Sequence, residues 1–268
     1  MSNPIKLTHL VDFNKTDFKM PRIFCNVPLS IHDSYQLPHE AARHIQVLRL
    51  QPGLSITLFN GEGGEFDAQI LEMTRKDVYV KILRFNPVER ESPIALHLAI
   101  GMPANERMDW LIEKTTELGL SRLTPLMTQH NVVRVNPERG DKKLLHWNAI
   151  SHSACAQSGR NRALRIDSPT RLIHWLENLQ SPASNNYPRW YFSLGVGSEP
   201  FQTQIHHFKE LGLTPNEVIV AFGPEGGWSL EEESLLQTHM FKPLSLGTRT
   251  LRAETAAISV VAALNLAL

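Results

Sequence analysis

The feature that most constrains this chain is a continuous apolar stretch, residues 218–222, followed at once by a loop with three glycines. A strand with no polar face is typical of the centre of a parallel sheet, where both faces are buried. The loop reads Gly223-Pro224-Glu225-Gly226-Gly227, and its glycines let the backbone approach a ligand closely. Ser229 and Glu232 form a capping box that predicts the start of a helix. Taken alone, the loop fits either an ordinary tight turn or a ligand-binding turn.

Apolar segments on both sides of this strand alternate between strand and helix periods. We predict strands at 94–100, 123–127 and 190–194, and helices at 108–118, 142–156, 171–179, 230–240 and 256–266. This alternation indicates an α/β fold. Residues 22–85 differ, because short apolar runs separated by glycine-rich turns predict a small all-β domain with one short helix within 38–50. A polar segment with two prolines, 86–93, marks the boundary.

Composition removes several classes of protein. Hydrophobic residues make up 42% of the 268 residues and charged residues 20%, which excludes an intrinsically disordered or fibrous chain. The longest apolar run, 255–268, is shorter than the roughly 20 residues of a membrane-spanning helix, and residues 1–20 lack the apolar core of a signal peptide. The two cysteines, far apart in sequence, provide neither a disulfide framework nor a thiolate zinc site, so a reducing cytoplasm fits best.

Charge is balanced over the whole chain but not along it. Lys plus Arg and Asp plus Glu each number 27. Residues 131–171 carry eight basic and three acidic residues, whereas residues 211–240 carry five acidic residues and no Lys or Arg. The basic segment suits a polyanion such as RNA, although a solvated surface gives the same pattern.

A second glycine-containing segment, residues 244–256, again predicts a strand, a turn and a helix start. Loops at the carboxyl ends of strands are where open α/β sheets bind ligands. Arg252 and Glu254 lie directly before an apolar helix, where charges are costly unless they are paired or functional. These two residues are therefore either a structural ion pair or part of a site.

Other motifs are excluded by their spacing. No paired His or Cys spacing suggests a metal site, so no metal is predicted. Neither a dinucleotide fingerprint nor a phosphate-binding GxxxxGK[ST] motif is present. Cys155, flanked by alanines, fits a helix packing position better than a nucleophile.

The ordered combination of motifs resembles the RsmE family of ribosomal RNA methyltransferases, which modify N3 of uridine 1498 in 16S rRNA of the small ribosomal subunit. The similarity extends from Arg22 to the C-terminus, through residues 21–24, 44–49, 113–119, 157–161, 223–227 and 246–256. It implies an N-terminal extension at 1–20, a PUA-like RNA-binding β-barrel at 21–88 and a trefoil-knotted, SPOUT-type α/β methyltransferase domain at 89–268. It also implies S-adenosylmethionine as cofactor, 16S rRNA or the 30S subunit as partner, a homodimer and a cytoplasmic location.

The resemblance also implies which residues form the sites. The expected cofactor-binding residues follow three strands: Leu194, Gly195, Phe222, Gly223, Pro224, Glu225, Gly226, Gly227, Leu246, Gly247, Leu251 and Arg252. The candidates for RNA contacts are Arg22, His44, Arg49, Arg160, Arg162 and Arg165. The sequence departs from the family pattern in its first 20 residues, at Trp228, and at Ala253, which replaces a usual threonine.

Uracil chemistry suggests roles for the charged candidates. N3 lies on the Watson–Crick edge, so the base must be unpaired or turned out of its helix before methylation. Loss of the N3 proton leaves an anion that a fixed guanidinium, Arg252 or Arg160, would stabilise. Glu254 or Glu225 would orient the arginine or accept the proton, and the general base is not identified. Methylation of tRNA or another rRNA base, and a non-catalytic RNA-binding or ribosome-assembly role, remain alternatives.

Overall fold

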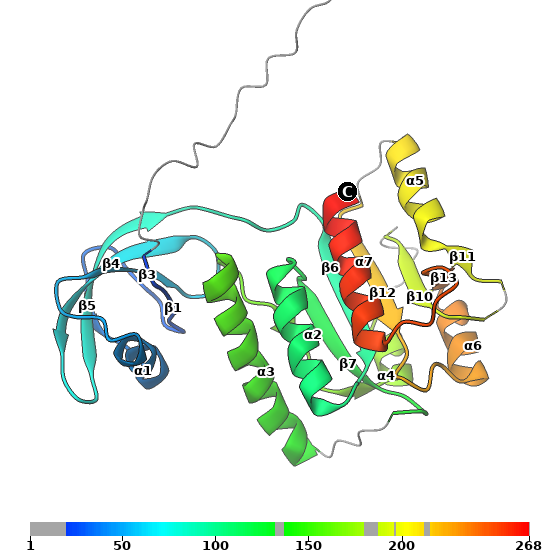
Figure 1. The fold of residues 1–268 in the computed structure, drawn as a ribbon, viewed down its shortest axis with the longest axis horizontal. Coiled ribbons are helices and arrows are strands. Elements are labelled where there is room, and N and C mark those ends of the chain that lie inside the picture. Colours follow the sequence, from blue (N-terminus) through cyan, green and yellow to red (C-terminus); the bar gives the residue numbers. More distant parts are fainter. Residues whose placement is uncertain (1–19, 132–136, 180–186, 196, 212–214, 268) are drawn as a thin grey trace, which may run out of the picture.

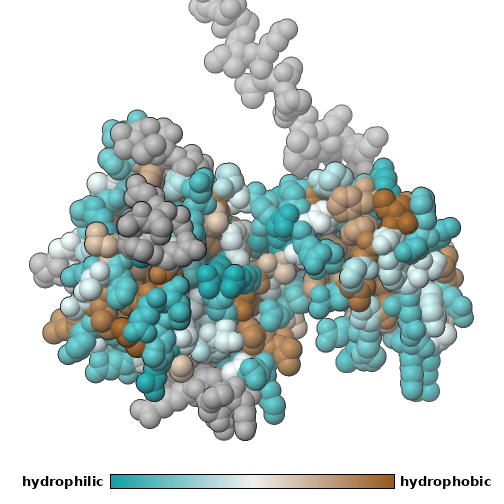
Figure 2. Space-filling view, turned by 180° about the vertical axis from the view of Figure 1, so that it is seen from behind, coloured by the Kyte–Doolittle hydropathy of each residue, from teal (hydrophilic) through white to brown (hydrophobic). Residues whose placement is uncertain are grey.

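The structure is a computed structural model that describes residues 20–131, 137–179, 187–195, 197–211 and 215–267. The protein consists of two units that lie side by side (Figure 1). Apart from Met20, the predicted N-terminal extension lies outside the described residues. Seen from behind, the two units form two lobes, each with brown hydrophobic patches among teal hydrophilic ones (Figure 2).

The N-terminal unit is a five-stranded sheet with strand order β1-β3-β4-β5-β2. Alternate residues of β4 are buried, and they pack with the buried side of α1, Ala41, Ala42 and Ile45, in one core. This arrangement confirms the predicted short strands and single short helix. The elements are β1 (Arg22–Phe24), β2 (Ser34–Gln36), α1 (His39–Val47), β3 (Ser55–Phe59), β4 (Glu65–Met73) and β5 (Val78–Asn86).

The C-terminal unit is a parallel sheet with strand order β11-β13-β10-β12-β6-β7-β8, and β9 also pairs with β7. Its strands are β6 (Ala95–Gly101), β7 (Arg122–Met127), β8 (Arg165–Ile166), β9 (Thr170–Arg171), β10 (Arg189–Phe192), β11 (Glu199–Pro200), β12 (Glu217–Phe222) and β13 (Lys242–Ser245). Its helices are α2 (Asn105–Glu117), α3 (Pro137–Ser158), α4 (Leu172–Glu177), α5 (Phe201–Leu211), α6 (Leu230–Thr238) and α7 (Ala253–Ala267). The predicted α/β alternation is confirmed, whereas α5 and the two-residue strands β8, β9 and β11 were not predicted.

Strand β12 is the central strand that the sequence predicted. It pairs with β10 on one side and β6 on the other, both in parallel. Val218, Val220 and Phe222 belong to a core that includes residues of α2, α3 and α7, while Ile219 and Ala221 belong to a second core with residues of α4 and α6. The apolar stretch thus fills two cores at once. Among the described residues, no helix is long and apolar enough to cross a membrane.

A polar joint connects the two units beside the end of α3. Arg22, whose side chain is 6% exposed, pairs with Glu65 at 2.5 Å and donates to the side-chain oxygen of Asn161 at 2.7 Å and to the Arg160 carbonyl at 3.0 Å. The ring of Phe24 stacks on His152 of α3, with centroids 3.6 Å apart. Burial lowers the pKa of His152 to about 4, so this stack contains a neutral imidazole at pH 7.

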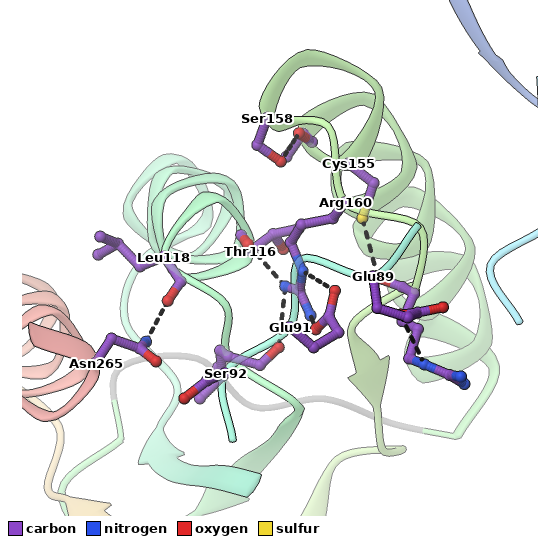
Figure 3. A network of polar contacts seen from close by, with 12 residues as sticks. Glu89, Glu91, Ser92, Thr116, Leu118, Cys155, Ser158, Arg160 and Asn265 are labelled. Atoms are coloured by element: carbon purple, nitrogen blue, oxygen red, sulfur yellow. Dashed lines mark hydrogen bonds and ion pairs between the residues drawn. The ribbon is translucent and has the colours of Figure 1, made fainter. Parts of the chain in front are cut away.

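Arg160 forms the most heavily bonded part of this joint (Figure 3). Its Nε and Nη2 donate to the two carboxylate oxygens of Glu91 at 3.1 and 2.5 Å, while Nη1 donates to the carbonyls of Thr116 and Leu120 at 2.7 and 3.1 Å. Glu91 lies between β5 and β6, whereas Thr116 belongs to α2. One guanidinium therefore ties the end of α3 to the connection between the sheets and to α2.

Removal of this guanidinium should destabilise the protein strongly. We expect Arg160→Met to cost about 3 kcal/mol of unfolding free energy, because Glu91 and two carbonyls lose their donors while partly or fully buried. Denaturant unfolding monitored by tryptophan fluorescence measures this cost. Arg165→Met is the control: its side chain is 69% exposed and pairs with Asp167 at 3.3 Å, so its cost should stay below about 1 kcal/mol. Equal costs for the two variants would contradict this role for Arg160.

Candidate functional site

A cavity of about 460 Å³ opens where three neighbouring strands end. Its walls come from the segments that follow β10, β12 and β13, which lie side by side in the order β13-β10-β12. The carboxyl ends of parallel strands are the usual ligand-binding edge of an α/β sheet. The strand order therefore brings together loops that are about 30 and 20 residues apart in sequence, one of which is the glycine-rich loop.

The glycine-rich loop packs closely against β6 and against the turn after β7, and added side chains would not fit at these two contacts. A Cβ on Gly101, at the end of β6, would lie 2.6 Å from Pro224, and one on Gly226 would lie 2.8 Å from the His130 Cβ. Gly227 has φ of +73° and donates to the Pro224 carbonyl at 2.8 Å, which closes the turn. The backbone of this loop is thus held in place from β6 and from the turn after β7.

The predicted capping box at the end of this loop is confirmed. Ser229 Oγ accepts from the Glu232 amide at 3.2 Å, and the Ser229 amide donates to Glu232 at 3.0 Å. The second carboxylate oxygen of Glu232 accepts from the Gln129 amide at 2.8 Å. One buried glutamate therefore starts α6 and also attaches the loop to the turn after β7.

Two carboxylates meet an arginine beside the cavity. Arg107 of α2 pairs with Glu225 of the glycine-rich loop at 3.0 Å, and its Nε lies 3.8 Å from Glu254 of α7. Glu254 is only 4% exposed, and within the described residues its Oε2 has no hydrogen-bond partner. The ion pair between Arg252 and Glu254, considered from sequence, is not present. Arg107, which sequence analysis missed, takes that place.

Two other arginines line the cavity without a partner. Arg249 and Arg252 are exposed, and no hydrogen bond or ion pair joins either side chain to the rest of the described chain. Their guanidinium groups therefore retain all their donors for a ligand. An anionic or electron-rich group entering the cavity would meet positive charge at this wall.

Comparison with known families assigns the chain. The RNA methyltransferase domain model matches residues 90–265, and the RNA methyltransferase PUA domain model matches residues 37–83. The ribosomal RNA small subunit methyltransferase E of Buchnera aphidicola from Schizaphis graminum is 31% identical over 250 residues, covering 92% of this chain and 96% of that protein. This chain belongs to the ribosomal RNA small subunit methyltransferase E family.

Solved structures agree with this assignment. A Legionella pneumophila methyltransferase in complex with S-adenosylmethionine has a TM-score of 0.84 and 34% identity, covering 92% of this chain and 98% of the other. The family enzyme from Neisseria gonorrhoeae, also bound to S-adenosylmethionine, has a TM-score of 0.82 and 30% identity, covering 91% and 96%. The predicted family, the SPOUT-type fold with its N-terminal PUA-like domain, the enzyme class and the cofactor are thereby confirmed.

The structure gathers most of the predicted methyltransferase cofactor residues around one cavity. All of them line it except Gly226, which packs on His130, and Gly247, which lines a neighbouring hollow between α5 and α7. Nine further residues line the cavity and were not among the predicted cofactor contacts: Phe192, Ser193, Trp228, Glu233, Leu244, Arg249, Thr250, Ala253 and Ala256. Ser193 directly precedes a predicted residue, and Glu233 is one helical turn beyond the capping serine, so proximity to the loops was the available signal.

The predicted RNA contacts divide into two groups. His44 and Arg49 are exposed on or just after α1, Arg162 is 54% exposed and Arg165 is 69% exposed in their side chains. Arg22 and Arg160 are instead buried in the joint between the units, with side chains 6% and 4% exposed. The Nη groups of Arg22 and all three nitrogens of Arg160 already donate within the joint, so this placement argues against the predicted RNA-contacting role of both and the catalytic role of Arg160.

Cys155 is buried in α3, and burial raises the pKa of its thiol. A thiol kept protonated is a poor nucleophile. This environment fits the interpretation of Cys155 as a packing residue. No cluster of three or more potential metal ligands occurs among the described residues.

An added methyl group at Gly226 should displace the loop. We expect Gly226→Ala to weaken binding of S-adenosylmethionine about tenfold, because its Cβ would lie 2.8 Å from the His130 Cβ and the cradle must shift. Isothermal titration calorimetry measures the dissociation constant. His130→Gly removes the opposing atom, so it should restore most of the affinity when combined with Gly226→Ala. Unchanged affinity in Gly226→Ala would show that the packed loop is not part of the cradle.

Proposed function

We propose that this chain transfers a methyl group from S-adenosylmethionine to N3 of uridine 1498 in 16S rRNA of the small ribosomal subunit. The observation that supports this most directly is the cavity between three strand ends, in a chain similar over more than nine-tenths of its length to two methyltransferases solved with that cofactor. Its walls combine closely packed glycines with unpartnered arginines, which suits a cofactor and an anionic substrate at one place.

The residues around the cavity fit S-adenosylmethionine. The apolar residues Phe192, Phe222, Leu244, Leu246 and Leu251 provide a wall for the purine. In the glycine-rich loop a side chain at Gly223 would lie 3.1 Å from Gly227, so glycine keeps the backbone accessible to the cofactor at that position. When bound, the cofactor supplies a sulfonium-activated methyl group. We propose Leu194, Gly195, Gly223, Pro224, Glu225, Gly227, Leu246 and Leu251 as its principal contacts. Gly226 and Gly247 act through the shape of their loops.

Arg252 is the residue best placed to stabilise the uracil anion. It lines the cavity, is exposed and has no partner within the described chain. A guanidinium directed at O2 or O4 lowers the free energy of the base after N3 loses its proton, which makes N3 a nucleophile near neutral pH. An N3 anion held in line with the methyl group would accept it as the methyl–sulfur bond breaks, with S-adenosylhomocysteine as the leaving group. The residues of this chain would contribute mainly orientation.

Two carboxylates beside this wall are candidates for the proton chemistry: Glu225 lines the cavity, and Glu254 lies two residues after Arg252. Arg107 lies between them, which leaves one buried oxygen of Glu254, Oε2, without a donor. That oxygen is available to orient Arg252 or to accept a proton when substrate is bound. We therefore keep Glu254 in the proposed site together with Arg252 and remove Arg160 from it.

The N-terminal unit and the exposed basic side chains of the protein are proposed to bind the RNA. His44, Arg49, Arg162 and Arg165 present positive or protonatable groups to solvent, and each phosphate contact should give salt-dependent affinity. We also propose the division into residues 21–88 and 89–268, a homodimer and a cytoplasmic location. Exposed apolar residues on the two neighbouring helices α2 and α7, Trp110 and Leu266, support a partner surface.

Methyl transfer to unmodified ribosomal material tests the proposed function. With labelled S-adenosylmethionine, we expect N3-methyluridine to form in small subunits or 16S rRNA that lack this modification, as mapped by mass spectrometry. Naked rRNA, assembled 30S subunits and tRNA are compared side by side. Label only in tRNA or at another rRNA base would replace the proposed substrate, and cofactor binding without any transfer would contradict the proposed reaction.

Substitution of Arg252 should affect turnover more than cofactor binding. We expect Arg252→Gln to lower kcat about 100-fold at saturating cofactor, because the uracil anion loses its charged donor. Arg252→Lys keeps the charge without the planar fork and should recover part of that loss. Single-turnover assays measure the rate, and Arg171→Gln, an exposed arginine outside both proposed sites, is the control. An unchanged rate in Arg252→Gln would remove this residue from the mechanism.

A further inference from the structure

One acidic residue of the cavity belongs to none of the roles above. Glu233, in the first turn of α6, lines the cavity beside the segment that follows β10. Its side chain is half-buried, and no lysine, arginine or histidine of the described chain lies within ion-pair distance of its carboxylate. The other acid in the cavity lining, Glu225, differs because Arg107 pairs with it at 3.0 Å. Glu233 thus brings an unneutralised negative charge to the cavity.

Hydrogen bonds fix this carboxylate against the wall. The Ser193 hydroxyl donates to Glu233 Oε1 at 2.6 Å and accepts from the Gly195 amide at 2.9 Å. The Ser193 amide donates to the Leu244 carbonyl at 3.1 Å, which attaches this residue to β13. A Cβ on Gly195 would lie 3.9 Å from both oxygens of Glu233, so the carboxylate faces the backbone at that glycine. Its remaining acceptor sites are left for a donor that enters the cavity.

The position of Ser193 indicates which part of a nucleoside cofactor lies there. Ser193 directly follows Phe192, which pairs with Leu244 in the sheet register, and both belong to the apolar wall that we assign to the purine. In S-adenosylmethionine the ribose is bonded to the purine, whereas the amino-acid tail is separated from it by the ribose and the sulfonium. Ser193, one residue from the purine wall, and the Glu233 carboxylate that it holds therefore lie nearer to the ribose than to the amino-acid tail.

We propose that Glu233, held by Ser193, accepts hydrogen bonds from the ribose hydroxyls of S-adenosylmethionine. This inference rests on the proposed function. A carboxylate has two oxygens and no donor, so it matches a vicinal diol, and acidic residues bind ribose hydroxyls in this way in dinucleotide-binding folds. Glu233 would then select a ribose over a deoxyribose at the cofactor site, in addition to the backbone contacts of the glycine-rich loop.

The test compares one substitution across three ligands by calorimetry. S-adenosylhomocysteine binds without turnover, so its dissociation constant is measured for the wild-type protein and for Glu233→Gln. We expect Glu233→Gln to bind it about tenfold more weakly, which is the size of a charge-assisted hydrogen bond. With an analogue that lacks both ribose hydroxyls, wild type should lose about the same factor, and Glu233→Gln should bind within about twofold of wild type.

Two controls separate this contact from other effects. Glu231→Gln makes the same change in the same helical turn, but Glu231 is exposed and outside the cavity lining, so its affinity should match wild type. An analogue that lacks the α-amino group should retain the full effect of Glu233→Gln. Thermal unfolding midpoints of both variants verify that each is folded.

The outcomes distinguish this inference from the proposed function. Equal affinity of wild type and Glu233→Gln for S-adenosylhomocysteine overturns the ribose contact and leaves the methyltransferase proposal intact. An effect that persists without the hydroxyls but disappears without the amino group overturns it in favour of the amino-acid tail. If wild type binds no S-adenosylhomocysteine at all, the proposed function fails together with the contact.

Discussion

Burial of β12 on both faces is the constraint on which the rest of this methyltransferase depends. Its alternate residues fill two separate cores. A shift of the strand by one residue would exchange the residues that face each core, and a place at the edge of the sheet would expose apolar side chains to solvent. Pairing with β6 on one side and β10 on the other then fixes where the glycine-rich loop begins. The cavity is a consequence of this register, because its three walls follow strands whose ends are aligned by the same sheet.

Close packing of the loop explains why glycine is required there in physical terms. Gly101 of β6 allows Pro224 to lie against it, and Gly226 does the same for His130. Gly101 and His130 are each about a hundred residues or more from the loop in sequence. Their contacts restrict a loop whose glycines would otherwise have wide backbone freedom. Rigid support of a backbone cradle reduces the entropy lost when a cofactor binds, which favours affinity without additional side chains.

The elements whose signal is local could be predicted from the sequence. The apolar strand, the capping box and the three loops each have a pattern within about ten residues, and the structure contains all of them. The helix α5 was missed although Phe201, Ile205 and Phe208 follow the helical spacing i, i+4, i+7 and pack on the core, because the polar residues between them were interpreted as a polar stretch. Arg107 was missed because its partners, Glu225 and Glu254, are more than a hundred residues away. A pairing across that distance leaves no periodic pattern in the sequence.

The arginines show the same limit and how it affects interpretation of function. Arg160, Arg162 and Arg165 lie within six residues of sequence and were interpreted as one basic patch, yet only the last two are exposed. Arg160 has its donors engaged by Glu91 and by two carbonyls. A buried arginine whose donors are satisfied cannot bind phosphate without leaving a carboxylate unpaired. Breaking a buried ion pair in this way costs about 3–5 kcal/mol of stability. Exposed arginines without partners, Arg249 and Arg252, lose only solvent when a ligand arrives. The free energy already committed to each guanidinium, rather than its place in a basic run, therefore decides which arginines hold the fold and which are available to substrate.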